Sequence, residues 1–337
     1  MEDKISKSHN KGKIRKVNLT VDDYYNGIIS GNRAILSQAI TLIESKSQRD
    51  EQIAQDLITR ILPLSGNSIR IGISGSPGVG KSTFIETFGN FLINRGKKVA
   101  VLAIDPSSRR THGSILGDKI RMQNLSRNQS AFIRPSPSGD VGGGVSRKTR
   151  ETILLCEAAG YDIILIETVG VGQNEIEVRS MVDFFLVLLL PNEGDELQGI
   201  KKGIIELADA IAINKSDGDQ MAIAERTRKE YQMALHILSS KDKQWTPKVL
   251  TCSALYKQGI DEIWETIEEY IRYTKENGNF DKNRREQMLE WFDNLLKETI
   301  LDKYFQNNEF REKIEKQKEK ITNQEISPVN AVKEILI

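Results

Sequence analysis

Residues 69–83 read IRIGISGSPGVGKST. From Gly75 to Ser82 it fits the pattern G-x-x-x-x-G-K-[ST]. The pattern follows a short apolar run and opens a segment with helical spacing, which is the context that a phosphate-binding P-loop requires. The bland alternative is a glycine-rich turn with an accidental lysine, and the strand-then-helix context argues against it.

Each residue type in this loop has a chemical reason. Glycines let backbone N–H groups turn toward phosphates, and the N-terminus of the following helix adds a positive dipole end. Lys81 can reach the β- and γ-phosphates, and the Ser82 hydroxyl suits Mg²⁺, which prefers oxygen ligands. The predicted nucleotide-binding residues of the loop are Gly75, Ser76, Pro77, Gly78, Val79, Gly80, Lys81, Ser82 and Thr83.

Short apolar runs alternate with helical segments on the C-terminal side of the loop. Continuous apolar strands between helices indicate a mainly parallel sheet that is covered on both faces, so the fold class is α/β, a P-loop NTPase. Helices are predicted over 82–94 and 146–159, the second ending at Gly160. The predicted strands are 69–74, 98–104, 131–134, 161–166, 184–190, 210–213 and 248–251.

Two further motifs follow predicted strands and indicate the base that is recognised. Asn214, Lys215 and Asp217 belong to the pattern N-K-x-D, and Ser253, Ala254 and Leu255 follow a later strand. A carboxylate at Asp217 can accept from N1–H and the exocyclic amine of guanine, whereas adenine would leave it unpaired. The order and spacing of these motifs with the P-loop are those of a GTPase.

Between the two sets of motifs lies the predicted γ-phosphate region. Glu167 ends a buried strand at the position of a Walker-B carboxylate, where most GTPases have Asp, and Gly170 can bring its N–H to the γ-phosphate. Val171 stands where many small GTPases carry a water-orienting Gln, and Gln173 lies two residues further on. We therefore expect slow intrinsic hydrolysis that a partner accelerates.

The polar segment 105–118 lies where a switch I loop is expected. Its two terminal carboxylates, Asp105 and Asp118, are Mg²⁺ candidates together with Ser82 and Glu167. Asp118 also directly precedes a helical segment, so a helix N-cap is an equally good interpretation.

Composition limits the remaining possibilities. The chain has 337 residues and a net charge of +1, which argues against a strongly basic nucleic-acid binder. The longest apolar run, 184–190, is too short to span a bilayer, and no secretory signal is evident, so we expect a cytoplasmic protein with no membrane and no nucleic-acid partner. The two cysteines, Cys156 and Cys252, sit among apolar residues and are predicted to be core thiols, and the three histidines form no zinc spacing.

The two ends of the chain differ in sequence pattern from its central part. We expect a mobile basic tail over 1–20, a helical extension over 21–66, a G domain over 67–275 and a helical C-terminal part over 276–337. Half of residues 281–320 are charged, yet a helical apolar stripe runs through them. That stripe must pack either on its own domain or on another subunit, and base rates slightly favour the first.

Three long stretches, 101–122 (VLAIDPSSRRTHGSILGDKIRM), 132–175 (FIRPSPSGDVGGGVSRKTRETILLCEAAGYDIILIETVGVGQNE) and 194–219 (GDELQGIKKGIIELADAIAINKSDGD), resemble the MeaB/ArgK family. These are the G-protein chaperones of cobalamin-dependent acyl-CoA mutases, chiefly methylmalonyl-CoA mutase. The resemblance covers about residues 22–275. It implies a metallochaperone-type G domain and, for the C-terminal helices, a dimerisation arm and a homodimer, in place of packing on the same chain.

The resemblance also implies activity and roles. The protein would bind GTP and GDP with Mg²⁺, hydrolyse GTP slowly, gate adenosylcobalamin loading and help reactivate the mutase. Asp105, Asp118 and Glu167 match family positions assigned to Mg²⁺ and switch function. Segment 191–201 matches a third switch, in which Lys201 resembles a lysine of partner-stimulated hydrolysis, although a surface lysine would look the same. The predicted catalytic residues are then Lys81, Glu167, Gly170 and Lys201.

Departures from the family pattern fall in loops. His112 replaces a usual glycine, 139–142 reads GDVG in place of SGTL, and Asn192-Glu193 replaces a Gly-Ala type pair, so partner identity is less constrained than nucleotide binding. Two enzymatic alternatives stay open: a metal-insertion GTPase, which needs Cys or His ligands near the switches, and an ATP-dependent kinase supporting basic amino-acid transport, which Asp217 disfavours. A pure interaction protein with a dead nucleotide site is disfavoured by Lys81, Ser82 and Asp217.

Overall fold

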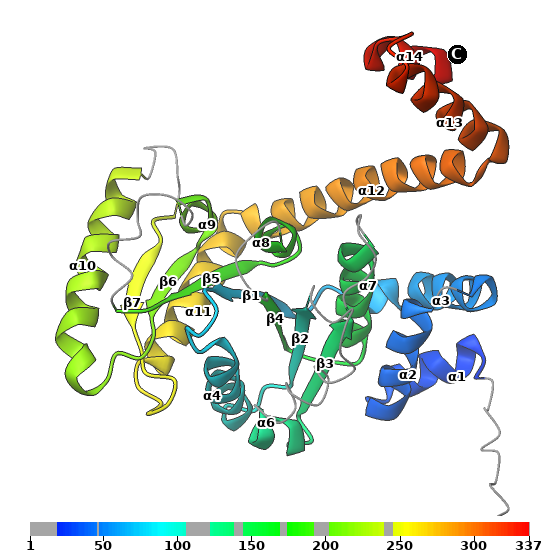
Figure 1. Ribbon diagram of the computed structural model, residues 1–337. Helices are drawn as coiled ribbons and strands as arrows, with labels where there is room; N and C mark the ends of the chain where they lie inside the picture. Colours follow the sequence, from blue (N-terminus) through cyan, green and yellow to red (C-terminus); the bar gives the residue numbers. More distant parts are fainter. Residues whose placement is uncertain are drawn as a thin grey trace, which may run out of the picture.

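The computed structural model describes residues 19–45, 47–105, 122–137, 144–168, 174–191, 202–238 and 245–336. Seven strands in this part of the chain form one parallel sheet in the order β3-β2-β4-β1-β5-β6-β7 (Figure 1). Each of the seven predicted apolar runs is a strand. The strands are β1 (Ile69–Gly75), β2 (Val99–Asp105), β3 (Ala131–Pro137), β4 (Ile163–Thr168), β5 (Phe184–Leu189), β6 (Ala210–Ile213) and β7 (Lys248–Thr251).

The P-loop strand lies at the centre of this sheet. β1 pairs with β4 on one side and with β5 on the other, and the register places Ile73 opposite Glu167. The chain continues from β1 toward β2 on one side and from β4 toward β5 on the other, so the strand order reverses next to β1. Parallel sheets bind ligands outside the carboxyl ends of strands at such a reversal.

One face of the sheet is covered by α4 (Lys81–Asn94), α6 (Gln123–Arg127) and α11 (Ile260–Glu276). Phe88 of α4 stacks on Phe84 at 5.4 Å and meets Trp264 of α11 at 6.1 Å between ring centroids. All three rings are buried, which fixes α4, and with it the loop that precedes α4, against the sheet.

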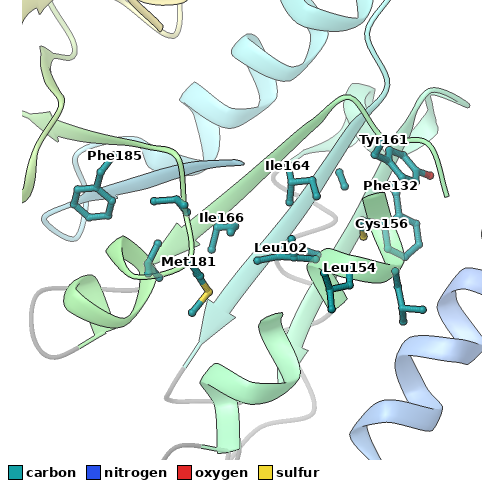
Figure 2. Close-up of a cluster of buried hydrophobic side chains, with 14 of the residues drawn as sticks. Leu102, Phe132, Leu154, Cys156, Tyr161, Ile164, Ile166, Met181 and Phe185 are labelled. Carbon is teal, nitrogen blue, oxygen red and sulfur yellow. The ribbon is translucent and has the colours of Figure 1, made fainter. Parts of the chain in front are cut away.

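The opposite face carries α7 (Gly144–Ala158), α8 (Asn174–Arg179), α9 (Lys202–Leu207) and α10 (Met221–Leu238). Figure 2 shows part of the core beneath them, in which Phe132 and Tyr161 lie with ring centroids 5.9 Å apart. Cys156 belongs to this core and Cys252 to the other one, so the prediction of core thiols is confirmed. None of the helices in the described ranges is long and apolar enough to cross a membrane.

The N-terminal segment forms three helices and a short turn of 3-10 helix: α1 (Val21–Ile29), α2 (Arg33–Glu44), α3 (Gln48–Ile61) and η1 (Leu62–Leu64). Between α1 and α2 the chain turns at Gly31, whose φ of 72° favours glycine, and Asn32 caps α2 through a bond from Ala34 N to its Oδ1. Leu36, Ile40 and Leu57 are fully or almost fully buried, and α2 and α3 pack against α7.

The C-terminal segment consists of α12 (Asn279–Gln306), α13 (Asn308–Thr322) and α14 (Pro328–Leu336), and Figure 1 shows α12 leading away from the sheet. Its first turns are anchored. Arg284 donates from Nε to Asp183 Oδ1 at 2.7 Å and from Nη2 to Asp183 Oδ2 at 2.6 Å, and the Asp183 side chain is almost completely buried. Further along, Trp291 packs against the core that underlies α7 and α8.

A second buried ion pair supports this junction. Arg70 of β1 donates to both carboxylate oxygens of Glu157 in α7, each at 2.9 Å, and Ser68 Oγ donates to the same group at 2.6 Å. Burial acts to raise the pKa of Glu157, but these bonds outweigh it and hold the pKa below its usual value. The start of β1, α7 and α12 therefore meet at a charged cluster whose members satisfy one another.

Candidate functional site

The backbone of the P-loop requires its glycines. Gly75, Gly78 and Gly80 have φ values of 150°, 82° and 98°. A Cβ at Gly75 would lie 2.4 Å from Leu188 O, and one at Gly80 would lie 2.8 Å from Asn214 Nδ2. The loop therefore passes so close to β5 and to the N-K-x-D segment that side chains are excluded at both positions.

The start of α4 has the geometry of an anion site. The helix begins at Lys81 directly after Gly80, which supplies no side-chain cap. Backbone N–H groups of a first turn need partners, and phosphate oxygens satisfy them well in the field of the helix dipole. The predicted arrangement of strand, glycine-rich loop and helix is thus present over residues 69–94.

Lys81 is buried, with 8% of its surface exposed, and its head folds back onto the loop. Nζ donates to Gly75 O at 2.6 Å and to Ser76 O at 3.2 Å. Burial lowers the pKa of the Lys81 ammonium, while the carboxylates of Glu167 and Glu175 act against this shift. The ammonium is thus held beside the loop, where a phosphate group would compensate its burial.

Ser82 and Glu167 lie together at the carboxyl end of the sheet. Ser82 Oγ donates to Glu167 Oε1 at 3.2 Å, and Glu167 is 6% exposed. The pairing of β4 with β1 brings Glu167 to the loop, because Ile73 stands opposite it in the register. A hydroxyl and a carboxylate at this distance offer the hard oxygen donors that Mg²⁺ prefers.

Asn214 joins the two halves of the site. Its Nδ2 donates to Val79 O in the P-loop at 2.9 Å, and its Oδ1 accepts from Ala254 N at 3.0 Å. Thr87 of α4 donates to Ala254 O at 2.7 Å, which adds a second connection. The phosphate loop, the end of β6 and the segment after β7 are therefore held in one unit.

The predicted base-recognition residues come together next to this unit. Ser253 Oγ donates to Asp217 Oδ2 at 2.6 Å, and Ser253 is fully buried. Asp217 directly precedes the 3-10 helix η3 (Gly218–Gln220). Lys215 adopts a φ of 59° and is exposed, and Leu255 is 69% exposed. The hydroxyl of Ser253 fixes the orientation of the carboxylate before any base is bound.

Several predicted site residues lie outside the described residues. These are Gly170, Lys201 and Asp118, together with the departures His112, Asp140, Asn192 and Glu193. Asp105 is the last residue of β2, at the carboxyl edge of the sheet where the P-loop also begins, and its side chain is not among those described.

One buried carboxylate was not anticipated from the sequence. Glu175, in the first turn of α8, is 1% exposed and lies with Oε1 3.5 Å from Ser74 Oγ, one residue before the P-loop. A Glu in a first helical turn is ordinary dipole chemistry, so no sequence signal distinguished it.

Comparison with known proteins identifies the family. The model of the "Methylmalonyl Co-A mutase-associated GTPase MeaB" family matches residues 36–309. GTPase ArgK from Escherichia coli (strain K12) is 48% identical over 305 residues, which cover 90% of this chain and 92% of that protein. The mitochondrial methylmalonic aciduria type A homolog from Mus musculus is 46% identical over 335 residues, covering 96% of this chain and 81% of that one.

A solved structure agrees with the fold. The crystal structure of a protein titled LAO/AO transport system kinase is 42% identical, covers 94% of this chain and 96% of its own, and superposes with a TM-score of 0.75. The Escherichia coli relative is named a GTPase, and the matching family model is described as that of a GTPase. The chain thus belongs to the MeaB family of methylmalonyl-CoA mutase-associated GTPases and is a GTPase.

Proposed function

We propose that this protein is a GTP-binding, slowly GTP-hydrolysing chaperone of a cobalamin-dependent acyl-CoA mutase, with methylmalonyl-CoA mutase as the first client to test. It would act in the cytoplasm, gate adenosylcobalamin loading and protect or reactivate the mutase. The family description supports the client. The observation that carries the nucleotide part is the carboxylate of Asp217, held by Ser253 at 2.6 Å in one unit with the P-loop.

We assign the two ends of the nucleotide to the two halves of this unit. The phosphates would lie on the N–H groups of the loop and the first turn of α4, with Lys81 turning from Gly75 O to a phosphate oxygen. The base would lie between Lys215 and the segment after β7, with Asp217 accepting from guanine. The remaining proposed contacts are Ser76, Pro77, Gly78, Val79, Gly80, Ser82, Thr83, Asn214, Ser253, Ala254 and Leu255.

The donor set at the end of β4 fits Mg²⁺. Ser82 and Glu167 would hold the ion, since their oxygens already lie 3.2 Å apart, and Asp105 and Asp118 are the proposed further carboxylates. When bound, Mg²⁺ supplies positive charge that neutralises the phosphate oxygens. Lys81 would add a second positive charge at the phosphates.

Slow hydrolysis is expected from the residues that we propose to lie near the γ-phosphate. Gly170 is proposed to sense that phosphate through its N–H, and position 171 holds Val, which cannot orient a water molecule as Gln does. Lys201, in segment 191–201, is the proposed element through which a partner raises the rate.

The C-terminal part of the chain would serve assembly. We propose that the chain is divided into a tail (1–20), a helical extension (21–66), a G domain (67–275) and a dimerisation arm (276–337). The support for a homodimer is the apolar stripe of α12, where Leu289 is 64% exposed and Phe292 is 59% exposed. A second copy of the chain would cover this stripe.

Two alternatives fit the described side chains less well. An ATP-dependent kinase of a basic amino-acid transport system would face Asp217 with adenine, which offers no donor there. A metal-insertion GTPase needs thiolate or imidazole ligands, but Cys156 and Cys252 are buried, and burial raises the pKa of Cys252 to about 12. Neither thiol is placed to receive a metal ion.

The first experiment tests base recognition by competition of GDP and ADP for the site. Asp217→Asn should reduce the preference for guanine by at least about 100-fold, because the carboxylate no longer accepts two N–H bonds. Asp219→Asn, two residues further on and exposed, is the matched control and should keep the preference. Unchanged selectivity of Asp217→Asn would refute the assignment.

The second experiment tests the client. GTP hydrolysis is measured with and without a cobalamin-dependent methylmalonyl-CoA mutase from the same organism, and we expect the mutase to raise turnover about tenfold or more. Lys81→Ala should abolish turnover in both mixtures, since its ammonium is the proposed contact to the β- and γ-phosphates. Slow turnover that no such mutase changes, with no complex on a sizing column, would contradict the chaperone proposal while leaving the GTPase intact.

A further inference from the structure

Three buried polar side chains meet directly beneath the P-loop. Thr168 Oγ1, at the end of β4, donates to Ser74 Oγ at 3.0 Å, and Ser74 Oγ donates to Glu175 Oε1 at 3.5 Å. Ser74 and Thr168 are fully buried and Glu175 is 1% exposed. The three residues come from β1, β4 and α8, and we refer to Ser74, Thr168 and Glu175 as the hydroxyl tether.

The packing of α8 on β1 explains why Glu175 reaches Ser74. Gly72 and Ser74 lie on the same face of β1, because alternate residues of a strand share a face. Glu175 and Val178 lie on the same face of α8, because residues three apart on a helix are neighbours. A Cβ at Gly72 would lie 3.0 Å from Val178 Cγ1, so the glycine allows α8 to approach the strand closely.

The position of the tether in the chain links it to the reaction. Ser74 immediately precedes Gly75 of the P-loop, and Thr168 immediately follows Glu167, which receives the hydrogen bond of Ser82. Five residues separate Thr168 from the first residue of α8. One hydroxyl of the P-loop strand therefore contacts both the end of β4 and the start of α8.

We propose that Glu175 is a positioning residue for GTP hydrolysis, which acts through the Ser74 hydroxyl to hold Glu167, by way of Thr168, and the start of α8 in register with the P-loop. This inference depends only on the GTPase activity of the family and not on the mutase. The bond from Ser74 to Glu175 is long at 3.5 Å, so we expect its removal to change fold stability little.

The experiment compares Glu175→Ala, Ser74→Ala and the double variant in steady-state hydrolysis and in GDP binding. Displacement of reacting groups by a fraction of an ångström to 1 Å costs up to about 100-fold, so we expect kcat to fall about 10- to 100-fold in each single variant. KM for GTP and the affinity for GDP should change less than about threefold, because the loop itself is unaltered. The double variant should be no slower than the slower single variant, since both break one connection.

Two isosteric variants make the test specific. Glu175→Gln keeps an oxygen that accepts from Ser74 but removes the negative charge. We expect kcat to remain within about threefold of the wild type, which distinguishes the effect of the hydrogen bond from that of the charge. Glu177→Gln, on the same helix but facing α12, should leave hydrolysis unchanged.

Three results would overturn the proposal. One is an unchanged kcat in both alanine variants. Another is a joint loss of GDP affinity and kcat in both, which would make the tether a part of the fold or of binding. The third is a double variant whose loss equals the sum of the single losses in free energy, which would show that Ser74 and Glu175 act independently.

Discussion

The consecutive helices α11 and α12 share a sequence pattern but differ in their surroundings. In α11 apolar residues recur at helical spacing along the whole helix, and in α12 they do so between Met288 and Ile300. In α11 the stripe is covered by the sheet and α4, and Ile263, Trp264 and Ile267 are at most 3% exposed. In α12 the residues Leu289 and Phe292 are 64% and 59% exposed. An amphipathic pattern shows that a helix needs a partner, and it does not show which partner.

The anchor of α12 explains where the difference begins. Phe280, Arg284 and Trp291 face the domain, and Arg284 is locked onto Asp183. Beyond residue 291 the helix continues for fifteen residues, to Gln306, which at 1.5 Å per residue is about 22 Å. Attachment to the domain at one end and exposed apolar side chains along the rest make α12 suited to present its apolar stripe to a partner.

The largest expected effect is on the covered helix. Trp264→Ala should lower the free energy of unfolding by about 4 kcal/mol, because it leaves a cavity among Phe88 and the sheet. Phe292→Ala, the matched truncation on α12, should cost less than about 1 kcal/mol in the monomer, since its ring is exposed. Urea unfolding at low protein concentration measures both. Equal losses would refute the contrast between the helices.

The second effect is on the anchor. Arg284→Ala should cost about 3 kcal/mol, because it leaves the buried Asp183 carboxylate without its bidentate partner. Arg285→Ala, on the next residue and exposed, should be nearly neutral. Limited proteolysis should then cleave α12 earlier in the first variant only. Arg284→Ala with wild-type stability and cleavage would show that the anchor lies elsewhere.

The third effect is on assembly. If a second copy covers the stripe, Phe292→Glu should convert dimers to monomers in light scattering, because a carboxylate would be buried without a partner. Asn294→Glu places the same charge on another side of α12 and should leave the dimer intact. A deletion from about residue 281 would be less specific, because it also removes Arg284. A dimer that survives Phe292→Glu would refute the proposed interface.

The smallest effect concerns the contact between α8 and α12. A cavity of about 380 Å³ lies between these helices and α7. Burial raises the pKa of Glu177 above its ordinary value of 4.5; Glu298 across the cavity raises it further, while Arg150 lowers it. The other titratable side chains around it are Arg147, Glu290 and Lys297.

The raised pKa of Glu177 determines how its contribution to stability changes with pH. The folded protein binds the Glu177 proton more tightly than the unfolded chain, so the contribution to stability is present below pH 4.5 and is lost as the pH rises through the raised value. Glu177→Gln should remove this loss and make the protein more stable at pH 7 by less than about 1 kcal/mol, with a smaller gain at pH 4. Urea midpoints at the two pH values test it. A variant less stable at pH 7 than the wild type would contradict this sign.

The sheet could be predicted from the sequence because its strands are buried on both faces. Runs such as 163–166 and 184–189 are apolar without interruption. They are also too short for typical helices, so they indicate strands of a parallel sheet. The P-loop and the residues Asn214 and Asp217 could be predicted because backbone geometry and base chemistry constrain their residue types locally.

What could not be predicted depends on contacts between distant segments. In the sequence, Glu175 looks like an ordinary carboxylate in a first helical turn. Only the structure shows that Val178 packs on Gly72 and that Glu175 thereby reaches Ser74. Base rates favoured packing of the α12 stripe on its own domain, and the structure shows that only the first turns do so. In both cases the decisive information is which surface lies opposite, and neither local spacing nor composition contains it.

Asn214 and Asp217 differ in a way that matters for protein engineering. Asn214 is 2% exposed and bonds backbone atoms of two loops, so any replacement would disturb the framework. In the described part of the chain, the Asp217 carboxylate accepts one side-chain hydrogen bond, from Ser253 Oγ. On the proposed assignment of the base to Asp217, the base specificity would be rewritten at one position without touching the P-loop, which offers a route to a variant that an orthogonal nucleotide controls inside a living cell.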